Sequence, residues 1–199
     1  MNYFLLATIA VMCAMTISTV LISCTRKNNH SVSGNNSNAD LVISFDSIEI
    51  EPYMQFGASL AEVGKYMTDN YEDYSVENPG SLLFVDGEDG DVWFRCYVKG
   101  DRRIGFYFAD KEGKNLKLVS YDFFFPMELE PVVAELERNG YVYKGEVKFD
   151  DYNADVCHLY LSADESVEVQ LSSWEKDGGS WAISFQPTCQ NDLEHIVAK

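Results

Sequence analysis

Two helical patterns in this chain are each followed by four short runs of alternating apolar and polar residues. The first helical pattern covers residues 60–70 and the second covers residues 129–138. The runs after the first helix are 81–85, 92–99, 103–109 and 116–123, and those after the second are 141–149, 154–161, 166–174 and 180–186. Short runs separated by turns rich in Gly and Asp are typical of antiparallel strands. The order of elements therefore repeats with a period of about 68 residues.

Local signals mark the ends of the predicted helices. Ser59 and Glu62 match a capping box, in which the Ser hydroxyl accepts an early N–H and the Glu carboxylate reaches back to the cap. The first helix is expected to end near Asn70. Pro131 falls in the first turn of the second helix, where its missing N–H costs little, and Asn139-Gly140 is a strong stop signal.

Alternation along the strands predicts which side chains face the helices. A sheet covered on one side shows apolar residues toward the core and other residues away from it. The apolar sets expected beneath the helices are Val92, Phe94, Cys96 and Val98, then Ile104, Phe106 and Phe108, then Val167, Val169 and Leu171. The predicted fold class is therefore α+β. Two tandem units, residues 40–125 and 126–199, are expected to form an antiparallel sheet with helices packed on one face and an open opposite face.

The N-terminal residues are uncharged as far as Arg26, and residues 3–23 form one apolar stretch. This stretch fits a secretory signal or a transmembrane anchor. Leu21-Ile22-Ser23-Cys24 resembles the bacterial lipobox, which predicts a signal peptide over residues 1–23 and a lipid on Cys24, although no Lys or Arg precedes the stretch. An uncleaved anchor would instead leave the chain in the cytoplasm, because its basic residues follow the stretch.

Residues 24–39 follow the predicted signal and are rich in Asn and Ser, as flexible tethers are. Together these features predict a lipid-anchored protein of the cell envelope, at the outer membrane of a Gram-negative bacterium. The chain has 15 basic and 32 acidic residues, a formal net charge of -17. Such a charge repels phosphate backbones, so we expect no nucleic-acid partner, and it disfavours docking on anionic lipid through charge alone.

The doubled helix-plus-four-strand order resembles the fold of the β-lactamase inhibitory protein family and of small bacterial lipoproteins with that architecture. The residues that carry the resemblance are Phe56-Gly57-Ala58-Ser59, Val63, Tyr66-Met67 and Lys114-Asn115-Leu116, within residues 52–188. In the inhibitor, an open concave sheet face grips a partner protein. The resemblance implies a similar architecture here. It does not imply inhibition of a β-lactamase, because no inhibitor contact residues match.

Aromatic and basic residues are predicted to gather on the open sheet face. They are Trp93, Arg95, Tyr97, Arg103, Tyr107, Lys117 and Tyr121, joined by Trp174 from the second unit. Tyr, Trp and Arg dominate binding hot spots, and an acidic loop of a partner protein or a stacked sugar would fit them. The alternative is that aromatic pairs across the strands only stabilise the exposed face of the sheet.

This face favours a non-enzymatic protein that binds an unidentified macromolecule, with a protein as the first expectation. Two other functions stay open: a structural or assembly factor of an outer-membrane complex, and a glycan-binding module. The three histidines, His30, His158 and His195, show no spacing typical of metal ligands, and the chain has no GxSxG or HExxH motif. We therefore expect no catalytic residues, no metal and no cofactor.

Two acidic turns, residues 86–91 and 151–155, offer carboxylates that suit calcium. Both lack the EF-hand pattern, because Tyr97 and Ser162 stand where a bidentate Glu belongs. Solvated hairpin turns are the favoured interpretation of both segments.

Cys96 and Cys157 both fall in the second strand of their unit, while Cys189 stays unplaced. With the strands in chain order, the first two cysteines lie four strands apart, at about 4.8 Å per strand. This distance exceeds the reach of a disulfide, so we expect two buried free thiols.

Overall fold

The computed structural model describes residues 45–85, 92–147, 156–174 and 179–188. Its helices there are α2 (Leu60–Asn70) and α3 (Glu130–Arg138). Its strands there are β1 (Ser75–Val76), β2 (Leu83–Val85), β3 (Val92–Lys99), β4 (Arg102–Phe108), β5 (Leu116–Phe123), β6 (Val142–Glu146), β7 (Val156–Leu161), β8 (Val167–Trp174) and β9 (Ser180–Pro187). No helix in these ranges is long and apolar enough to cross a bilayer. The signal peptide, Cys24, the tether, both acidic turns and Cys189 lie outside the described residues.

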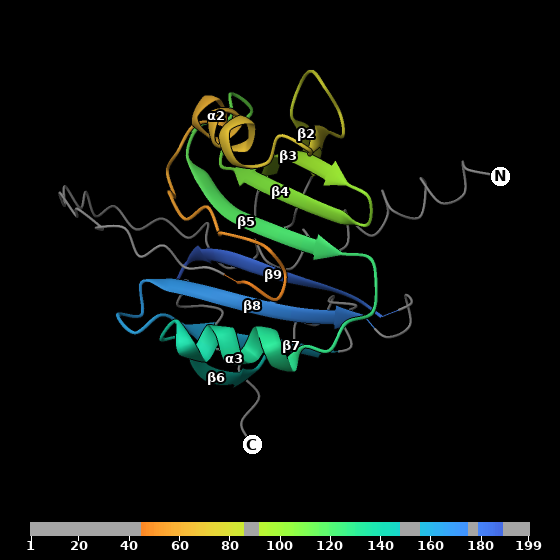
Figure 1. The fold of residues 1–199 in the computed structure, drawn as a ribbon. Helices are drawn as coiled ribbons and strands as arrows, with labels where there is room; N and C mark the ends of the chain where they lie inside the picture. The colour runs from red at the N-terminus through yellow and green to blue at the C-terminus, as the bar shows by residue number, and fades with distance from the viewer. Residues whose placement is uncertain (1–44, 86–91, 148–155, 175–178, 189–199) are drawn as a thin grey trace.

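The described strands form one antiparallel sheet, and with two helices beside it the predicted α+β class is confirmed. The order is β1-β3-β4-β5-β9-β8-β7-β6, with β2 also paired to β3 (Figure 1). The strands therefore do not follow chain order, because β9 lies beside β5 and the second group enters the sheet in reverse. Both β5 and β9 are buried along nearly their whole length, and their central position keeps this apolar surface out of water.

One apolar cluster, the main core, contains side chains from the sheet and from both helices. Val63 and Met67 come from α2, and Val132 and Leu136 come from α3. The strands contribute Tyr97, Ile104, Phe106, Phe108, Leu116, Val119, Tyr121, Phe123, Tyr160, Val169, Leu171, Trp181, Ile183 and Phe185. We call the sheet face that carries these strand residues the core face, and the other one the opposite face.

A segment before α2 that the sequence pattern does not mark also enters the main core. We call residues 45–53 the strap, whose buried side chains are Phe45, Ile48, Ile50 and Tyr53. The backbone N–H and the hydroxyl of Ser47 both donate to the Glu135 carboxylate of α3, at 3.0 and 2.5 Å. At the other end of the strap, Tyr53 N donates to the Tyr121 hydroxyl at 3.0 Å. These bonds tie the strap to α3 and β5.

The face predicted for β3 is wrong. Trp93 lies opposite Phe108, and Tyr97 lies opposite Ile104. Since directly opposite residues share a face and both β4 residues belong to the main core, Trp93 and Tyr97 lie on the core face. The apolar set lies on the opposite face, where three of its members form a second cluster with Tyr107 and Leu118, namely Val92, Phe94 and Cys96. The apolar residues of β4 and β8 do pack in the main core or against it, as predicted.

Cys96 and Cys157 are buried, and neither forms a disulfide within the described part of the chain, as the sequence predicts. Four strands, β4, β5, β9 and β8, stand between β3 and β7 in the sheet. At about 4.8 Å per strand the two cysteines are too far apart for a disulfide, although the strand order differs from the expected one.

Candidate functional site

The structure divides the predicted binding residues between the two faces of the sheet. Register places Trp93, Arg95, Tyr97 and Tyr121 on the core face, and Arg103, Tyr107 and Trp174 on the opposite face. Lys117 is half-buried at an irregularity in the β4–β5 pairing. The expectation that these side chains share one open face is therefore wrong.

Four of the predicted binding residues are buried. Tyr97 is 8% exposed, Arg103 and Tyr107 are each 2% exposed, and Tyr121 is 1% exposed. Burial raises the pKa of the Tyr121 hydroxyl well above its ordinary value. The Tyr107 side chain folds over Gly105, where an added Cβ would lie 2.8 Å from the Tyr107 hydroxyl. These side chains hold the sheet together instead of presenting a surface to a partner.

The centre of the opposite face carries polar side chains that bond to one another. Arg103 Nη2 and Nε each lie 2.8 Å from Asp122 Oδ2, and the Ser120 hydroxyl donates to Asp122 Oδ1 at 2.5 Å. On β8, the Glu168 carboxylate accepts bonds from the side-chain amides of Gln170 and Gln186, at 2.9 and 2.6 Å. The Asp122 carboxylate therefore neutralises the charge of Arg103 inside the fold.

An exposed pair of rings remains at one edge of the sheet. Phe84 of β2 lies directly opposite Trp93 of β3, and their ring centroids are 5.3 Å apart. Phe84 is 51% exposed, whereas Trp93 is half-buried. Together with the neighbouring Arg95 we call these residues the aromatic edge. Phe84 is not among the predicted binding residues, because residues 82–85 are all apolar and show no alternation that marks one of them as outward.

Arg95 holds the backbone beside the aromatic edge. Its Nη1 donates to Asn78 O at 3.1 Å, and its Nη2 donates to Gly80 O at 2.6 Å. Glu77 N donates to Cys96 O at 3.0 Å, which ties the start of the same connection to β3. These hydrogen bonds tie the segment between β1 and β2 to β3. The same segment leads into β2, which carries Phe84, so the bonds also hold Phe84 beside Trp93 of β3.

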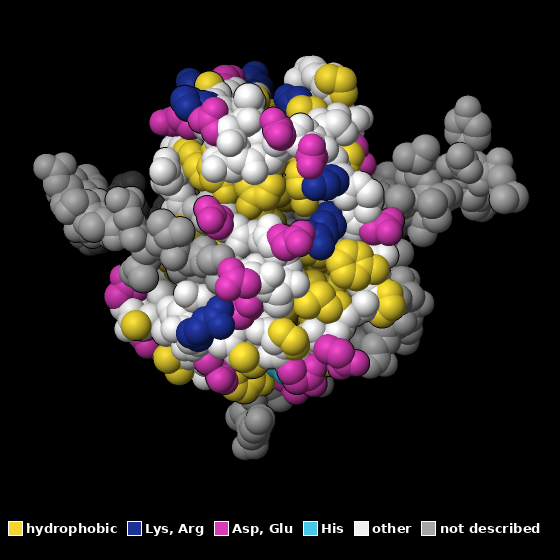
Figure 2. Space-filling model, in the orientation of Figure 1, with side chains coloured by type: hydrophobic (Ala, Val, Ile, Leu, Met, Phe, Trp, Pro, Cys, Tyr) yellow, Lys and Arg dark blue, Asp and Glu magenta, His cyan; other side chains and the backbone are white. Residues whose placement is uncertain are grey.

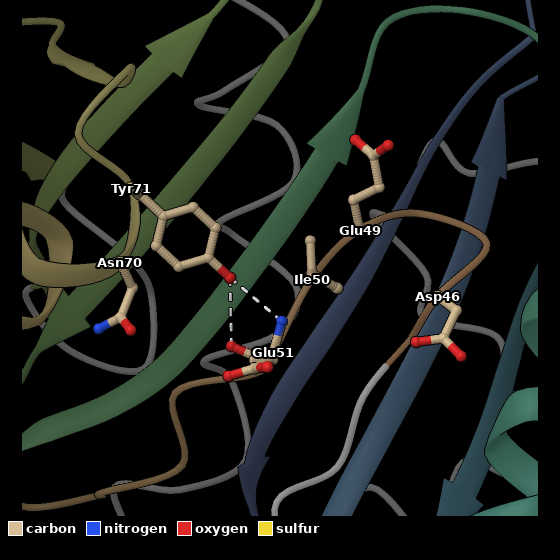
Figure 3. Close-up of a pocket in the computed structure, with 6 residues that line it drawn as sticks. All are labelled: Asp46, Glu49, Ile50, Glu51, Asn70 and Tyr71. Atoms are coloured by element: carbon tan, nitrogen blue, oxygen red, sulfur yellow. Dashed lines mark hydrogen bonds between the residues drawn. The ribbon is translucent and has the colours of Figure 1, made fainter.

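A shallow pocket of about 380 Å³ lies between the strap and the end of α2 (Figure 3). Its lining consists of Asp46, Glu49, Ile50, Glu51, Asn70 and Tyr71. The Tyr71 hydroxyl accepts from Glu51 N at 3.1 Å and donates to Glu51 O at 3.3 Å, while Glu49 pairs with Arg102 at 3.2 Å. In the described part of the chain, no group of three His, Cys, Asp or Glu side chains converges as a metal site requires.

No protein-family model, curated protein or solved structure matches this chain. The assignment of a function therefore depends on the geometry of the aromatic edge and on the sequence.

Proposed function

We propose that this chain is a non-enzymatic lipoprotein of the cell envelope that binds a protein partner through the aromatic edge. The observation that carries the proposal is the half-exposed ring of Phe84, packed on Trp93 at the edge of the sheet. Aromatic side chains and Arg are the residue types that dominate protein-binding hot spots. The proposal keeps Trp93 and Arg95 from the predicted set, and it adds Phe84.

The hydrogen bonds that Arg95 makes to the backbone beside the aromatic edge favour binding. A partner that packs on Phe84 covers apolar surface, which is worth about 25 cal/mol per Å². Because Arg95 already fastens the connection between β1 and β2, little backbone freedom remains to be lost on association.

The tandem architecture belongs to the same proposal. Each group of strands ends at the centre of the sheet, at β5 and β9, and both helices contribute to the main core. This arrangement supports two tandem units whose helices pack on the core face, the first of which has the two-residue strand β1 in addition to the four predicted strands. An experimental structure with α2 and α3 on different faces would contradict it.

The lipid anchor is tested on the mature protein. We expect the purified chain to begin at Cys24 and to carry fatty acyl chains, as read by intact mass, and we expect a Cys24→Ser variant to keep residues 1–23. A wild-type chain that retains these residues would identify the uncleaved anchor and refute the lipoprotein assignment.

Binding is tested by photo-cross-linking from two matched positions. The full-length chain carries benzoylphenylalanine in place of Phe84 or of Val142, which is 52% exposed on β6 at the other edge of the sheet. We expect one protein to be cross-linked from position 84 and not from position 142. That protein, once purified, should bind the Phe84→Ser variant about tenfold more weakly than wild type, and Val142→Ser normally.

The structural or assembly role is favoured by a different observation. The large hydrophobic residues exposed in the described chain are Phe84 on β2 and Val142 and Tyr143 on β6. Cross-links from position 142 and none from position 84 would move the docking site to β6 and support this alternative. A glycan at the aromatic edge would give no protein cross-link from either position, and that result would refute protein binding.

A further inference from the structure

We propose that residues 189–199 cover the part of the opposite face formed by β7, β8 and β9, with the apolar side of a short helix. The proposal goes beyond the proposed function, because it assigns an occupant from the chain itself to a sheet face that the sequence predicts to be open. It does not depend on the aromatic edge, which lies at β2 and β3.

Three apolar side chains of β7 are buried on the opposite face. Cys157, Leu159 and Leu161 are each at most 3% exposed. Leu159 lies directly opposite Gln170 of β8, which the register places away from the main core. None of the three belongs to the two apolar clusters that the described residues form. Burial of apolar side chains outside these clusters requires a segment packed over β7.

Polar side chains between β7 and β9 are buried on the same face. Gln170 and Gln186 both donate to Glu168, and all three are likewise at most 3% exposed. The described helices and the strap place their buried apolar side chains in the main core, on the other side of the sheet. Figure 2, drawn from that other side, shows charged side chains spread over its surface. The cover of the opposite face therefore comes from residues outside these elements.

Strand β9 ends beside the buried surface. Thr188 N donates to Ser166 O at 3.0 Å, so the chain leaves the sheet next to the start of β8. Leu161 ends β7 at the same end of the sheet. β7 is two strands from β9, about 10 Å away, and a helix over residues 192–199 is about 12 Å long. Residues 189–199 are thus long enough to reach from β9 to β7.

The sequence after β9 has the pattern of an amphipathic helix. Leu193, Ile196 and Val197 follow the i, i+3, i+4 spacing of one helix side. Asn191 is a favoured N-cap residue, and Glu194 stands three positions later, as in a capping box. The apolar side of such a helix packs on the apolar row of β7, while its charged residues face water.

Thiol alkylation of the full-length chain tests this cover. Cys157 lies beneath it on β7, and Cys96, with four strands between them, is the internal control. Iodoacetamide labelling is followed at each cysteine by peptide mass mapping. We expect Leu193→Ser/Ile196→Ser to label Cys157 at least about tenfold faster than wild type, with no change at Cys96. The matched control His195→Ser/Ala198→Ser alters the other side of the same helix and should leave both rates unchanged.

Equal labelling of Cys157 in wild type and in the Leu193→Ser/Ile196→Ser variant would overturn the proposal. Faster labelling of both cysteines would mean that the variant is unfolded, and photo-cross-linking then decides. Benzoylphenylalanine in place of Leu193 keeps an apolar side chain, and it should cross-link within the chain to residues 156–174. The same group in place of His195 should not. Cross-links from position 193 to other parts of the chain or to a second copy, or none, would refute the proposal.

Discussion

Replacing Asp122 with Asn removes the negative charge that neutralises Arg103 on the opposite face of the sheet. The two side chains are 6% and 2% exposed, and both Nε and Nη2 of Arg103 lie 2.8 Å from Asp122 Oδ2. Removing one partner of a buried ion pair costs about 3–5 kcal/mol, because the remaining charge stays out of water. Asn keeps the shape of Asp and can still accept a hydrogen bond, so we expect a loss of about 3 kcal/mol in the free energy of unfolding.

The loss is measured by urea denaturation followed by tryptophan fluorescence. With a slope of about 2 kcal/mol per M, the midpoint should fall by about 1.5 M. The control Asp69→Asn breaks the exposed pair with Lys65, whose side chains are 53% and 77% exposed, and it should cost under about 0.5 kcal/mol. The double variant Arg103→Met/Asp122→Leu should recover most of the stability, because it removes both charges. A midpoint for Asp122→Asn equal to that of the control would refute the reasoning.

Three further predictions concern packing, capping and pH. Gly105→Ala should lower stability by about 1–3 kcal/mol in thermal unfolding, because the new Cβ meets Tyr107 at 2.8 Å; an unchanged midpoint would contradict the position of that ring. Ser59→Ala should cost about 1 kcal/mol, because the Ser hydroxyl accepts from Glu62 N at 3.4 Å at the start of α2; unchanged helix stability in circular dichroism would contradict this capping. Hydrogen bonds from neighbouring serine hydroxyls lower the pKa of Asp164 to about 2. The ionised Asp164 therefore adds to the free energy of unfolding above its unfolded pKa of about 4, and this stabilisation is lost as the pH falls toward 2. Asp164→Asn should remove that part of the acid sensitivity, and identical acid profiles for variant and wild type would contradict the prediction.

Local signals predicted the elements well where they act within a few residues. The capping box at Ser59 and Glu62 is present in the structure, and α2 ends at Asn70 as expected. The bounds predicted for β3 and β5, residues 92–99 and 116–123, agree with the structure. Capping and turn chemistry depend on neighbouring residues alone, so the sequence carries them without knowledge of the fold.

The candidate site was predicted only in part. Trp93 and Arg95 lie at the aromatic edge, but Tyr97, Tyr107 and Tyr121 are buried and help to pack the sheet. A Tyr side chain can lie on an exposed binding surface or in the core, because its ring is apolar and its hydroxyl can form a hydrogen bond. In the core, the Tyr121 hydroxyl accepts a hydrogen bond from Tyr53 N of the strap. The aromatic residues on these strands were therefore predicted to form a binding surface, but several of them are buried and pack the sheet instead.

Strap residues were missed for a related reason. Phe45, Ile48 and Ile50 are too few and too irregularly spaced to show a helix or strand period, yet they are 0–3% exposed. They pack in the main core with residues distant in the chain, as Phe45 does with Phe185, and Ser47 between them donates both of its bonds to Glu135, 88 positions away.

The amino-acid sequence by itself determined the elements of this protein: an antiparallel α+β pattern, helix ends, turns and an acidic charge. Only the tertiary structure decided the strand order and which face of β3 meets the core, and so which aromatic residues are exposed. Alternation with a period of two defines two faces of a strand but does not say which is inward. The inward face is set by strand pairing, namely that of Trp93 with Phe108 and that of β5 with β9. These pairings bury the largest apolar surface, and they join residues that are far apart in the chain.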